Sequence, residues 1–282
     1  MNIDWKKVDP LIDWSIDEDV GTGDITTDGV LYEKVPAVGE MIAKDVMVVA
    51  GLEIVSRILS KVTNDFEFNA NFRDGDIVPD KAVIATIRAE AHILLTHERV
   101  ILNYLQRLSG IATYASKFAS QVEGTKAKII DTRKTTPGWR VLEKYAVRIG
   151  GGKNHRFGLF DAVLVKDNHI KMVGSITEAV NRMREFVPHY LKIEVEASCP
   201  EEVREALESG VEIIMLDNMN EELIADMVKL IAGRATIEVS GGVNLGNVKK
   251  IAELGVDLIS IGAITHSAAA EDISMTINPL NS

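Results

Sequence analysis

The stretch from Asp131 to His169 concentrates the residues that could do chemistry. Its 39 residues hold 8 of the 31 Lys and Arg but only 4 of the 42 Asp and Glu, so it carries +4 (8 − 4) and the rest of the chain −15 (23 − 38). Arginine forms paired hydrogen bonds with carboxylate or phosphate, lysine supplies a point charge, and glycine lets backbone N–H groups approach oxygens. This segment therefore predicts a site for a small, multiply charged anion. The alternative is a solvated basic face.

Four cations of this segment form the core of the predicted site: Arg133, Lys134, Arg156 and Lys166. Placed in one cleft, they would repel one another, and an anion of two or more charges would relieve that repulsion. For each cation taken singly, an ion pair with Asp161 or Asp167 is the alternative. A solitary pair would explain one cation but not all four together.

Acidic residues and histidines complete the set of candidates. Glu196 and Asp217 each close an apolar run, and they could balance the cations, bind ribose hydroxyls, or hold Mg²⁺ together with water and substrate oxygens. Glu194 is a second candidate, because a period of two puts it on the same side of a strand as Glu196. His155 could bind substrate or be a satisfied loop residue, and His169 could equally cap the next helix.

The totals exclude several classes of protein. A chain of 282 residues with 46% apolar residues and a mean hydropathy of +0.07 indicates a globular protein with a large core in one or two domains. The net charge of −11 argues against nucleic acid or an anionic membrane as partner. Cys199 alone cannot form an internal disulfide, and no His/Cys spacing suggests zinc. With no signal-peptide or membrane-spanning run, we expect a cytoplasmic protein.

The first part of the chain mixes helices and strands without strict alternation. Apolar periodicity predicts helices over 8–20 and 51–62 and strands over 38–49 and 82–87. A long helical region over 91–122 follows, with an interruption expected near Ser109-Gly110. We interpret this part as an α+β domain over residues 1–110.

After Gly124 the pattern becomes a regular repeat of strand, loop and helix. Apolar runs end at six positions, each followed by a helical segment or by the end of the repeat: Asp131, Lys166, Glu196, Asp217, Ser240 and Gly262. The helical segments lie near 138–149, 175–187, 200–209, 220–232 and 244–254. Six parallel βα units favour a barrel over an open sheet. The sequence thus predicts an α/β catalytic domain over 111–267, with 268–282 packed on the N-terminal domain.

The barrel interpretation has a functional consequence, because active sites of such barrels lie in the loops at the C-terminal strand ends. The cations and acids named above fall at those ends. The last two units add Ser240-Gly241-Gly242 and Gly262-Ala263 before His266. A phosphate site from the last two loops is common in these barrels, so a phosphorylated ligand is expected.

Three motifs together resemble the quinolinate phosphoribosyltransferase family. They are Thr132-Arg133-Lys134-Thr135-Thr136-Pro137-Gly138, then Gly150-Gly151-Gly152-Lys153-Asn154-His155-Arg156, then Lys166-Asp167-Asn168-His169. The motifs occur in the right order, and further matches run from Gly21 to Ala268. The resemblance implies an α+β N-terminal domain joined to an open β/α barrel, in a homodimer or an assembly of dimers with shared active sites.

The resemblance also implies a role for each site residue. It assigns Thr132, Arg133, Lys134, His155, Arg156 and Lys166 to the substrates, and Arg99 of the N-terminal domain to quinolinate. It assigns Glu196 and Asp217 to the ribose and to Mg²⁺, and Ser240, Gly241, Gly262 and His266 to phosphate. Lys134, Lys166, Glu196 and Asp217 are the residues it makes catalytic.

The reaction implied is a transfer of phosphoribosyl from phosphoribosyl pyrophosphate to quinolinate, giving nicotinate mononucleotide, pyrophosphate and CO₂ in NAD biosynthesis. Mg²⁺ would arrive with the pyrophosphate, and no organic cofactor is needed because the alkylated ring nitrogen accepts electrons. Two alternatives remain. One is a paralogue of the same scaffold, either the molybdenum-transport-associated homologue or a nicotinate phosphoribosyltransferase. The other is a phosphate-binding barrel without turnover.

Overall fold

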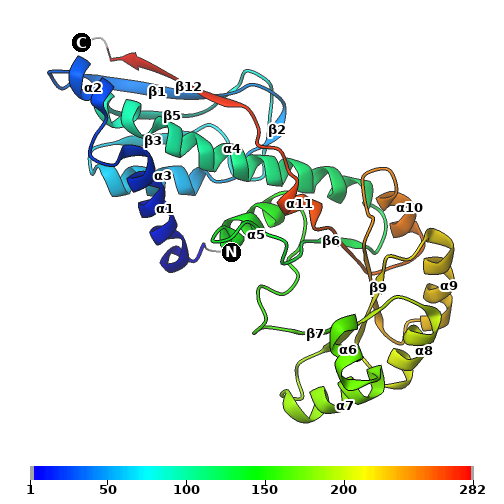
Figure 1. The fold of residues 1–282 in the computed structure, drawn as a ribbon. Helices are drawn as coiled ribbons and strands as arrows, with labels where there is room; N and C mark the ends of the chain where they lie inside the picture. Colours follow the sequence, from blue (N-terminus) through cyan, green and yellow to red (C-terminus); the bar gives the residue numbers. More distant parts are fainter. Residues whose placement is uncertain (1–2, 281–282) are drawn as a thin grey trace. The chain divides into compact units, whose positions relative to one another are not determined.

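The structure, a computed structural model, describes residues 3–280. These residues form two compact units (Figure 1). The first unit comprises residues 3–116, 136–151 and 267–280, and the second comprises residues 117–135 and 152–266. This division differs from the predicted ranges, because residues 111–116, 136–151 and 267 group with the first unit and not with the barrel. Within the described residues, no helix is both long and apolar enough to cross a membrane.

The first unit is built on an antiparallel sheet in the order β12-β1-β5-β3. Its strands are β1 (Pro36–Ala43), β3 (Glu67–Ala70), β5 (Val83–Glu90) and β12 (Ile273–Pro279). β1 alternates buried and partly exposed residues, which is the period expected of a sheet with one face on the core. Its partner β12 comes from the far end of the sequence and pairs with it from Ala37↔Pro279 to Ala43↔Ile273.

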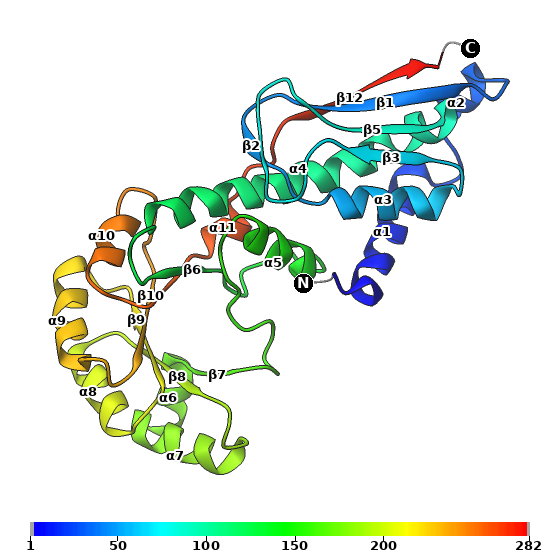
Figure 2. The ribbon, with the colours of Figure 1, turned by 180° about the vertical axis from the view of Figure 1, so that it is seen from behind.

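Helices cover one face of this sheet, as Figures 1 and 2 show for α1 (Trp5–Val20), α3 (Leu52–Val62) and α4 (Ala91–Gln121). These elements confirm the helices predicted over 8–20 and 51–62. The unit is completed by α2 (Ile25–Val30), α5 (Arg140–Ile149) and the two-stranded pair β2 (Met47–Val48) and β4 (Ile77–Val78).

The predicted break near Ser109-Gly110 is wrong, because α4 continues through both residues. A Cβ at Gly110 would lie 2.0 Å from the carbonyl oxygen of Ala269, so the glycine allows a close backbone approach within a continuous helix. Ser109 is fully buried, and its hydroxyl accepts a hydrogen bond from the backbone N–H of Ala50 at 3.1 Å. Both residues that suggested a break are therefore packing residues.

The second unit contains six parallel strands in the order β6-β11-β10-β9-β8-β7. They are β6 (Lys128–Ile130), β7 (Val163–Val165), β8 (Ile193–Ala197), β9 (Ile213–Asp217), β10 (Thr236–Ser240) and β11 (Leu258–Ser260). Within the described residues no ladder joins β6 to β7, so the barrel is open between them. The predicted α/β class with an open barrel is confirmed.

Helices α7 (Ile176–Phe186), α8 (Pro200–Glu208), α9 (Glu221–Ile231) and α10 (Val248–Glu253) lie along the outside of this sheet (Figure 2). Each connects one strand to the next parallel strand, as the repeat predicted. Two short helices follow strand ends, α6 (Asp167–Val173) and α11 (Ala263–His266), and periodicity did not predict them.

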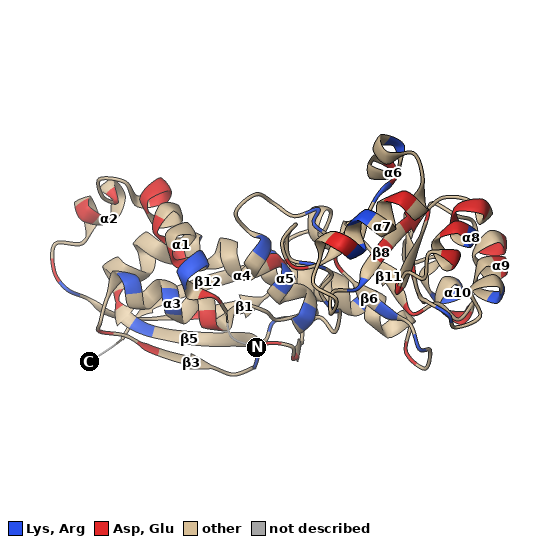
Figure 3. Ribbon diagram, turned by 90° about the horizontal axis from the view of Figure 1, so that it is seen from below, with Lys and Arg blue, Asp and Glu red and all other residues tan. Residues whose placement is uncertain are grey.

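Figure 3 shows acidic residues on the ribbons of α1, α8 and α9. The first turns of α8 and α9 carry Glu201, Glu202, Glu221 and Glu222, at the end of each helix where negative charge is stabilised. These glutamates lie outside the cationic segment 131–169 and contribute to the net charge of −11.

Candidate active site

The predicted barrel residues gather at the C-terminal edge of the six-stranded sheet. Asp217 and Ser240 are the last residues of β9 and β10, Glu196 is the last but one of β8, and Lys166 directly follows β7. In register, Ser240 lies opposite Asp217 and Glu196 lies opposite Met215. The remaining barrel residues lie in the segments that follow β6, β10 and β11: Thr132, Arg133, Lys134, His155, Arg156, Gly241, Gly262 and His266.

Lys166 and Glu196 form an ion pair across the neighbouring strands β7 and β8. The backbone N–H of Lys166 donates to Nδ1 of His169 at 2.9 Å, which fixes the start of α6. His169 therefore caps the start of α6, the role that the sequence suggested for it. Because the Lys166 side chain is 44% exposed, its ammonium is accessible to an anion that competes with Glu196.

The guanidinium of Arg156 is partly desolvated. Burial and the nearby positive charge of Arg133 lower the pKa of Arg156, and the carboxylates of Glu194 and Asp161 oppose that effect. A lowered pKa means that its surroundings make the charged form of the guanidinium less stable. An incoming anion would restore that stability. This observation agrees with the predicted repulsion within the cationic set.

Lys134, Gly262 and His266 lie together beside α11. A Cβ added to Gly262 would approach Cδ of Lys134 to 2.8 Å and the ring of His266 to 3.3 Å. The hydroxyl of Thr265 donates to the carbonyl of Lys134 at 2.7 Å, and the backbone N–H of Lys134 donates to the hydroxyl of Thr132 at 3.0 Å. The loops after β6 and β11 are thereby fixed to each other, and a side chain at position 262 would displace the lysine.

The loops after β9 and β10 are joined through Asn218. Its backbone N–H donates to the carbonyl of Ser240 at 2.9 Å, and its side-chain amide donates to Asp217 at 2.7 Å. A cavity of about 610 Å³ opens beside these loops, with Asn218, Gly241, Gly242 and Asn247 in its lining. Glu221 and Glu222 of α9 also line this cavity, and the phosphate role of Ser240 and Gly241 stays a prediction.

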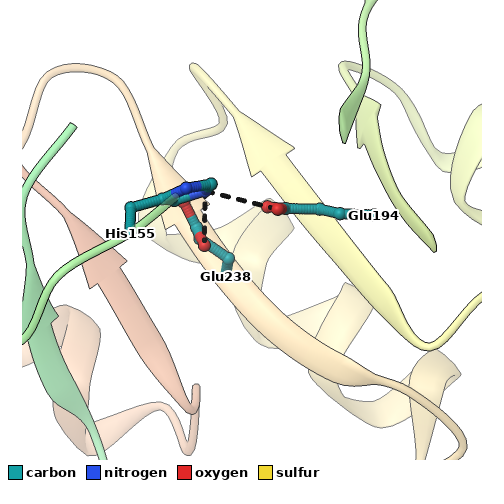
Figure 4. A group of neighbouring side chains, drawn as sticks. All are labelled: His155, Glu194 and Glu238. Atoms are coloured by element: carbon teal, nitrogen blue, oxygen red, sulfur yellow. Dashed lines mark ion pairs between the residues drawn. The ribbon is translucent and has the colours of Figure 1, made fainter. Parts of the chain in front are cut away.

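His155 points into the barrel interior, where two buried glutamates meet it (Figure 4). Its Nε2 lies 3.3 Å from Glu194 of β8 and 3.6 Å from Glu238 of β10. The two glutamates are 4% and 1% exposed. Burial, and after it the negative charge of Glu194, raise the pKa of Glu238 to about 8, so this carboxyl is mainly protonated at neutral pH.

Sequence reasoning considered Glu194 but missed Glu238. The available signal was the position of each acid inside an apolar run, Ile193-Glu194-Val195 and Ile237-Glu238-Val239. Strands of a parallel barrel are buried on both faces, so a charged residue within such a run requires a partner. Arg99, the predicted site residue outside the barrel, is exposed on α4 in the first unit.

Comparisons with known proteins cover almost the whole chain. The family model for the quinolinate phosphoribosyl transferase N-terminal domain matches residues 24–109, and that for the C-terminal domain matches residues 111–276. A probable nicotinate-nucleotide pyrophosphorylase [carboxylating] of Synechocystis is 45% identical over 277 residues, covering 97% of this chain and 93% of its own length. One of Bacillus subtilis is 42% identical over 264 residues, covering 94% and 91%. The crystal structure of NadC from Streptococcus pyogenes superposes with a TM-score of 0.95 at 38% identity and covers 100% of both chains.

Proposed function

The chain belongs to the quinolinate phosphoribosyltransferase family, and from that premise we propose that it transfers phosphoribosyl from phosphoribosyl pyrophosphate to quinolinate with loss of CO₂. The products are nicotinate mononucleotide, pyrophosphate and CO₂, and the reaction serves NAD biosynthesis. The observation that carries the proposal is the set of cations and acids at the C-terminal edge of one parallel sheet.

The negative charges of the two substrates match the positive charges of the site. Quinolinate is a dianion and the phosphoribosyl donor a polyanion, so binding both requires several fixed cations. Arg133 and Arg156 offer planar forks for the two carboxylates, and the lowered pKa of Arg156 reflects a charge that burial and Arg133 disfavour until an anion arrives. Lys134 and Lys166 supply point charges, and Lys166 can exchange its partner Glu196 for a substrate oxygen.

Departure of pyrophosphate builds positive charge at the anomeric carbon and negative charge on the leaving group. Lys134, beside Gly262 and His266, is suited to the leaving group. Glu196 and Asp217, on adjacent strands, are suited to the ribose, through its hydroxyls and the developing cation. The quinolinate nitrogen attacks that carbon, the bond to the pyrophosphate oxygen breaks, and the ring becomes a pyridinium.

Glu196 and Asp217 are also the residues that would hold Mg²⁺. They offer two carboxylates, one paired with Lys166 and the other accepting from Asn218, which is a small oxygen set for a metal bound by protein alone. The donor set therefore fits an ion that keeps water and substrate oxygens as most of its ligands. Such an ion would neutralise charge on the pyrophosphate.

Loss of CO₂ follows from the pyridinium. The C–C bond to the carboxylate next to the ring nitrogen breaks, its electron pair stays on the ring carbon beside the positive nitrogen, and a proton then takes the place of CO₂. The ring itself is the electron sink, so no organic cofactor is part of the proposal. The ammonium groups of Lys134 and Lys166 are the candidates for stabilising the carbanion.

The proposal includes a homodimer, or an assembly of dimers, in which Arg99 of one subunit serves the barrel of its partner. A two-fold axis would build two equivalent sites in this way. A cytoplasmic location also belongs to the proposal and rests on the single cysteine, Cys199, which leaves no internal disulfide.

The test is a steady-state assay of CO₂ release with quinolinate and phosphoribosyl pyrophosphate. The proposal expects release that requires both substrates and yields nicotinate mononucleotide in equal amount. Nucleotide formation from nicotinate without CO₂ would indicate the paralogous activity. Binding of phosphorylated ligands with no turnover would indicate a binding barrel and refute the proposal.

A further inference from the structure

The barrel interior holds a polar cluster, His155, Glu194 and Glu238, and the reaction above gives no role to its two glutamates. The two carboxylates come from β8 and β10 and point toward one imidazole (Figure 4). Among the described residues, Oε1 of Glu194 and Oε1 of Glu238 are buried without a hydrogen-bond partner. Buried polar atoms of this kind cost free energy, so their presence calls for a functional explanation.

Hydrogen bonds determine the tautomer of the ring. Nδ1 of His155 accepts from the backbone N–H of Arg156 at 2.6 Å, so a neutral ring carries its proton on Nε2, directed at the glutamates. The backbone N–H of His155 and the side chain of Asn154 both donate to the buried Asp131, at 2.9 and 2.6 Å. The ring and the chain on either side of it are thus held at three points.

This tautomer argues against a metal ion in the cluster. The three ligand atoms lie within 4.8 Å of one another, which a cation would tolerate. A metal, however, requires the lone pair of Nε2, and in this arrangement Nε2 carries the proton. A proton on Glu238 instead reduces the repulsion between the two carboxyl groups, whose oxygens lie within 4.8 Å of each other.

We propose that Glu194 and Glu238 are positioning residues of the anion site: their carboxyl groups, 3.3 and 3.6 Å from Nε2, hold the His155 ring and, through the adjoining chain, the Arg156 guanidinium for a dicarboxylate. The inference rests on the proposed function for the identity of that dicarboxylate. Glu194 attracts the Arg156 guanidinium, and the raised pKa of Glu238 limits the further negative charge that would repel the substrate.

The charged groups around Glu238 come from few elements. β8 contributes Glu194, and the segment after β6 contributes His155 and, next to it, Arg156. Its register partners, Met215 of β9 and Leu258 of β11, are uncharged. The hydroxyl of Ser260 on β11 is a further hydrogen-bonding neighbour. Ionisation of Glu238 at high pH therefore adds a negative charge beside His155 and the anion-site cations.

The experiment measures binding of phthalate, an unreactive dicarboxylate that is fully ionised above pH 7. Calorimetry between pH 7 and 9.5, in two buffers of different ionisation enthalpy, gives the affinity and the number of protons taken up. For wild type, we expect affinity to fall by about 3- to 10-fold across this range and a proton to be taken up on binding near pH 8.5. Glu238→Gln, an isostere of the protonated acid, should bind with nearly constant affinity and take up no proton.

Two further variants keep the test decisive. Glu208→Gln changes an exposed glutamate of α8 in the same unit and should behave as wild type. Glu194→Gln removes the like charge beside Glu238, so the fall in affinity should move to lower pH. If Glu238→Gln keeps the wild-type pH dependence, or if Glu194→Gln leaves it in place, the positioning role is refuted.

Two more outcomes separate this inference from others. Metal analysis of the purified protein that finds a stoichiometric divalent ion, absent from Glu238→Gln, would overturn the inference in favour of a metal centre. If wild type binds phthalate with the expected pH dependence yet releases no CO₂ from quinolinate, the proposed reaction fails while the positioning role stands. If it turns over quinolinate but shows no proton uptake, the reaction stands and the inference fails.

Discussion

Replacement of the buried Glu238 by glutamine should change how the free energy of unfolding depends on pH. The carboxyl is 1% exposed, and burial together with Glu194 raises its pKa from an ordinary value of 4.5 to about 8. The folded state binds this proton more tightly than the unfolded state. Ionisation of the buried carboxyl therefore lowers the free energy of unfolding, and this loss is absent below pH 4.5. It grows as the pH rises and is complete above about pH 8.

The magnitude follows from the two pKa values. Their difference (8 − 4.5) corresponds to a full cost of about 5 kcal/mol at 1.36 kcal/mol for each factor of ten in proton affinity. Between pH 6 and pH 9 the wild type should lose about 2–3 kcal/mol through this group. Glu238→Gln cannot ionise, so its stability relative to wild type should rise by that amount between the two pH values.

Urea denaturation at pH 6, 7.5 and 9, followed by circular dichroism, measures the effect. Circular dichroism is required because all three tryptophans, Trp5, Trp14 and Trp139, lie in the first unit and Glu238 lies in the second. Glu208→Gln on the surface of α8 is the matched control, and it should run parallel to wild type. Parallel curves for wild type and Glu238→Gln would show that no buried proton is held here, and the reasoning would be wrong.

Four other predictions concern the site and the fold. Lys166→Ala should lower kcat by about 100-fold and change KM for quinolinate less, because the ammonium acts on developing charge; a raised KM with kcat unchanged would contradict this. Calorimetry should find nicotinate weaker than phthalate by about 1–3 kcal/mol, since one fixed cation loses its carboxylate, and equal affinities would exclude that cause. Mixing inactive Arg99→Ala with inactive Lys166→Ala should restore roughly a quarter of wild-type activity if sites are shared, and none, with subunit exchange verified by mass spectrometry, if they are not. Gly110→Ala should destabilise the first unit by about 1–3 kcal/mol in tryptophan-monitored denaturation, because its Cβ meets the Ala269 carbonyl, while Gly29→Ala, with nothing within 4 Å, serves as control.

Secondary structure was accessible from the sequence where one physical signal dominated. Apolar runs such as Ile213-Ile214-Met215-Leu216 favour buried strands, and this run forms β9, which ends at Asp217 as the sequence indicated. Amphipathic segments such as 176–186 form helices, because apolar residues repeated at the helical period place one face of the helix on the core. The expected break at Gly110 failed because a local helix propensity cannot report a backbone contact with Ala269, 159 residues (269 − 110) further along the chain.

The sequence by itself determined which charged residues follow which strand. Because the C-terminal ends of parallel strands share one edge of the sheet, it also determined that cations and acids meet there. Only the tertiary structure decided which of them are partners. Lys166 pairs with Glu196, and Glu238 meets His155 inside the barrel, because strand register and the curvature of the sheet bring together side chains that lie 30 (196 − 166) and 83 (238 − 155) residues apart. Sequence fixes the type and the edge of each group, whereas burial and distance, which set pKa values and ion pairs, exist only once the sheet has formed.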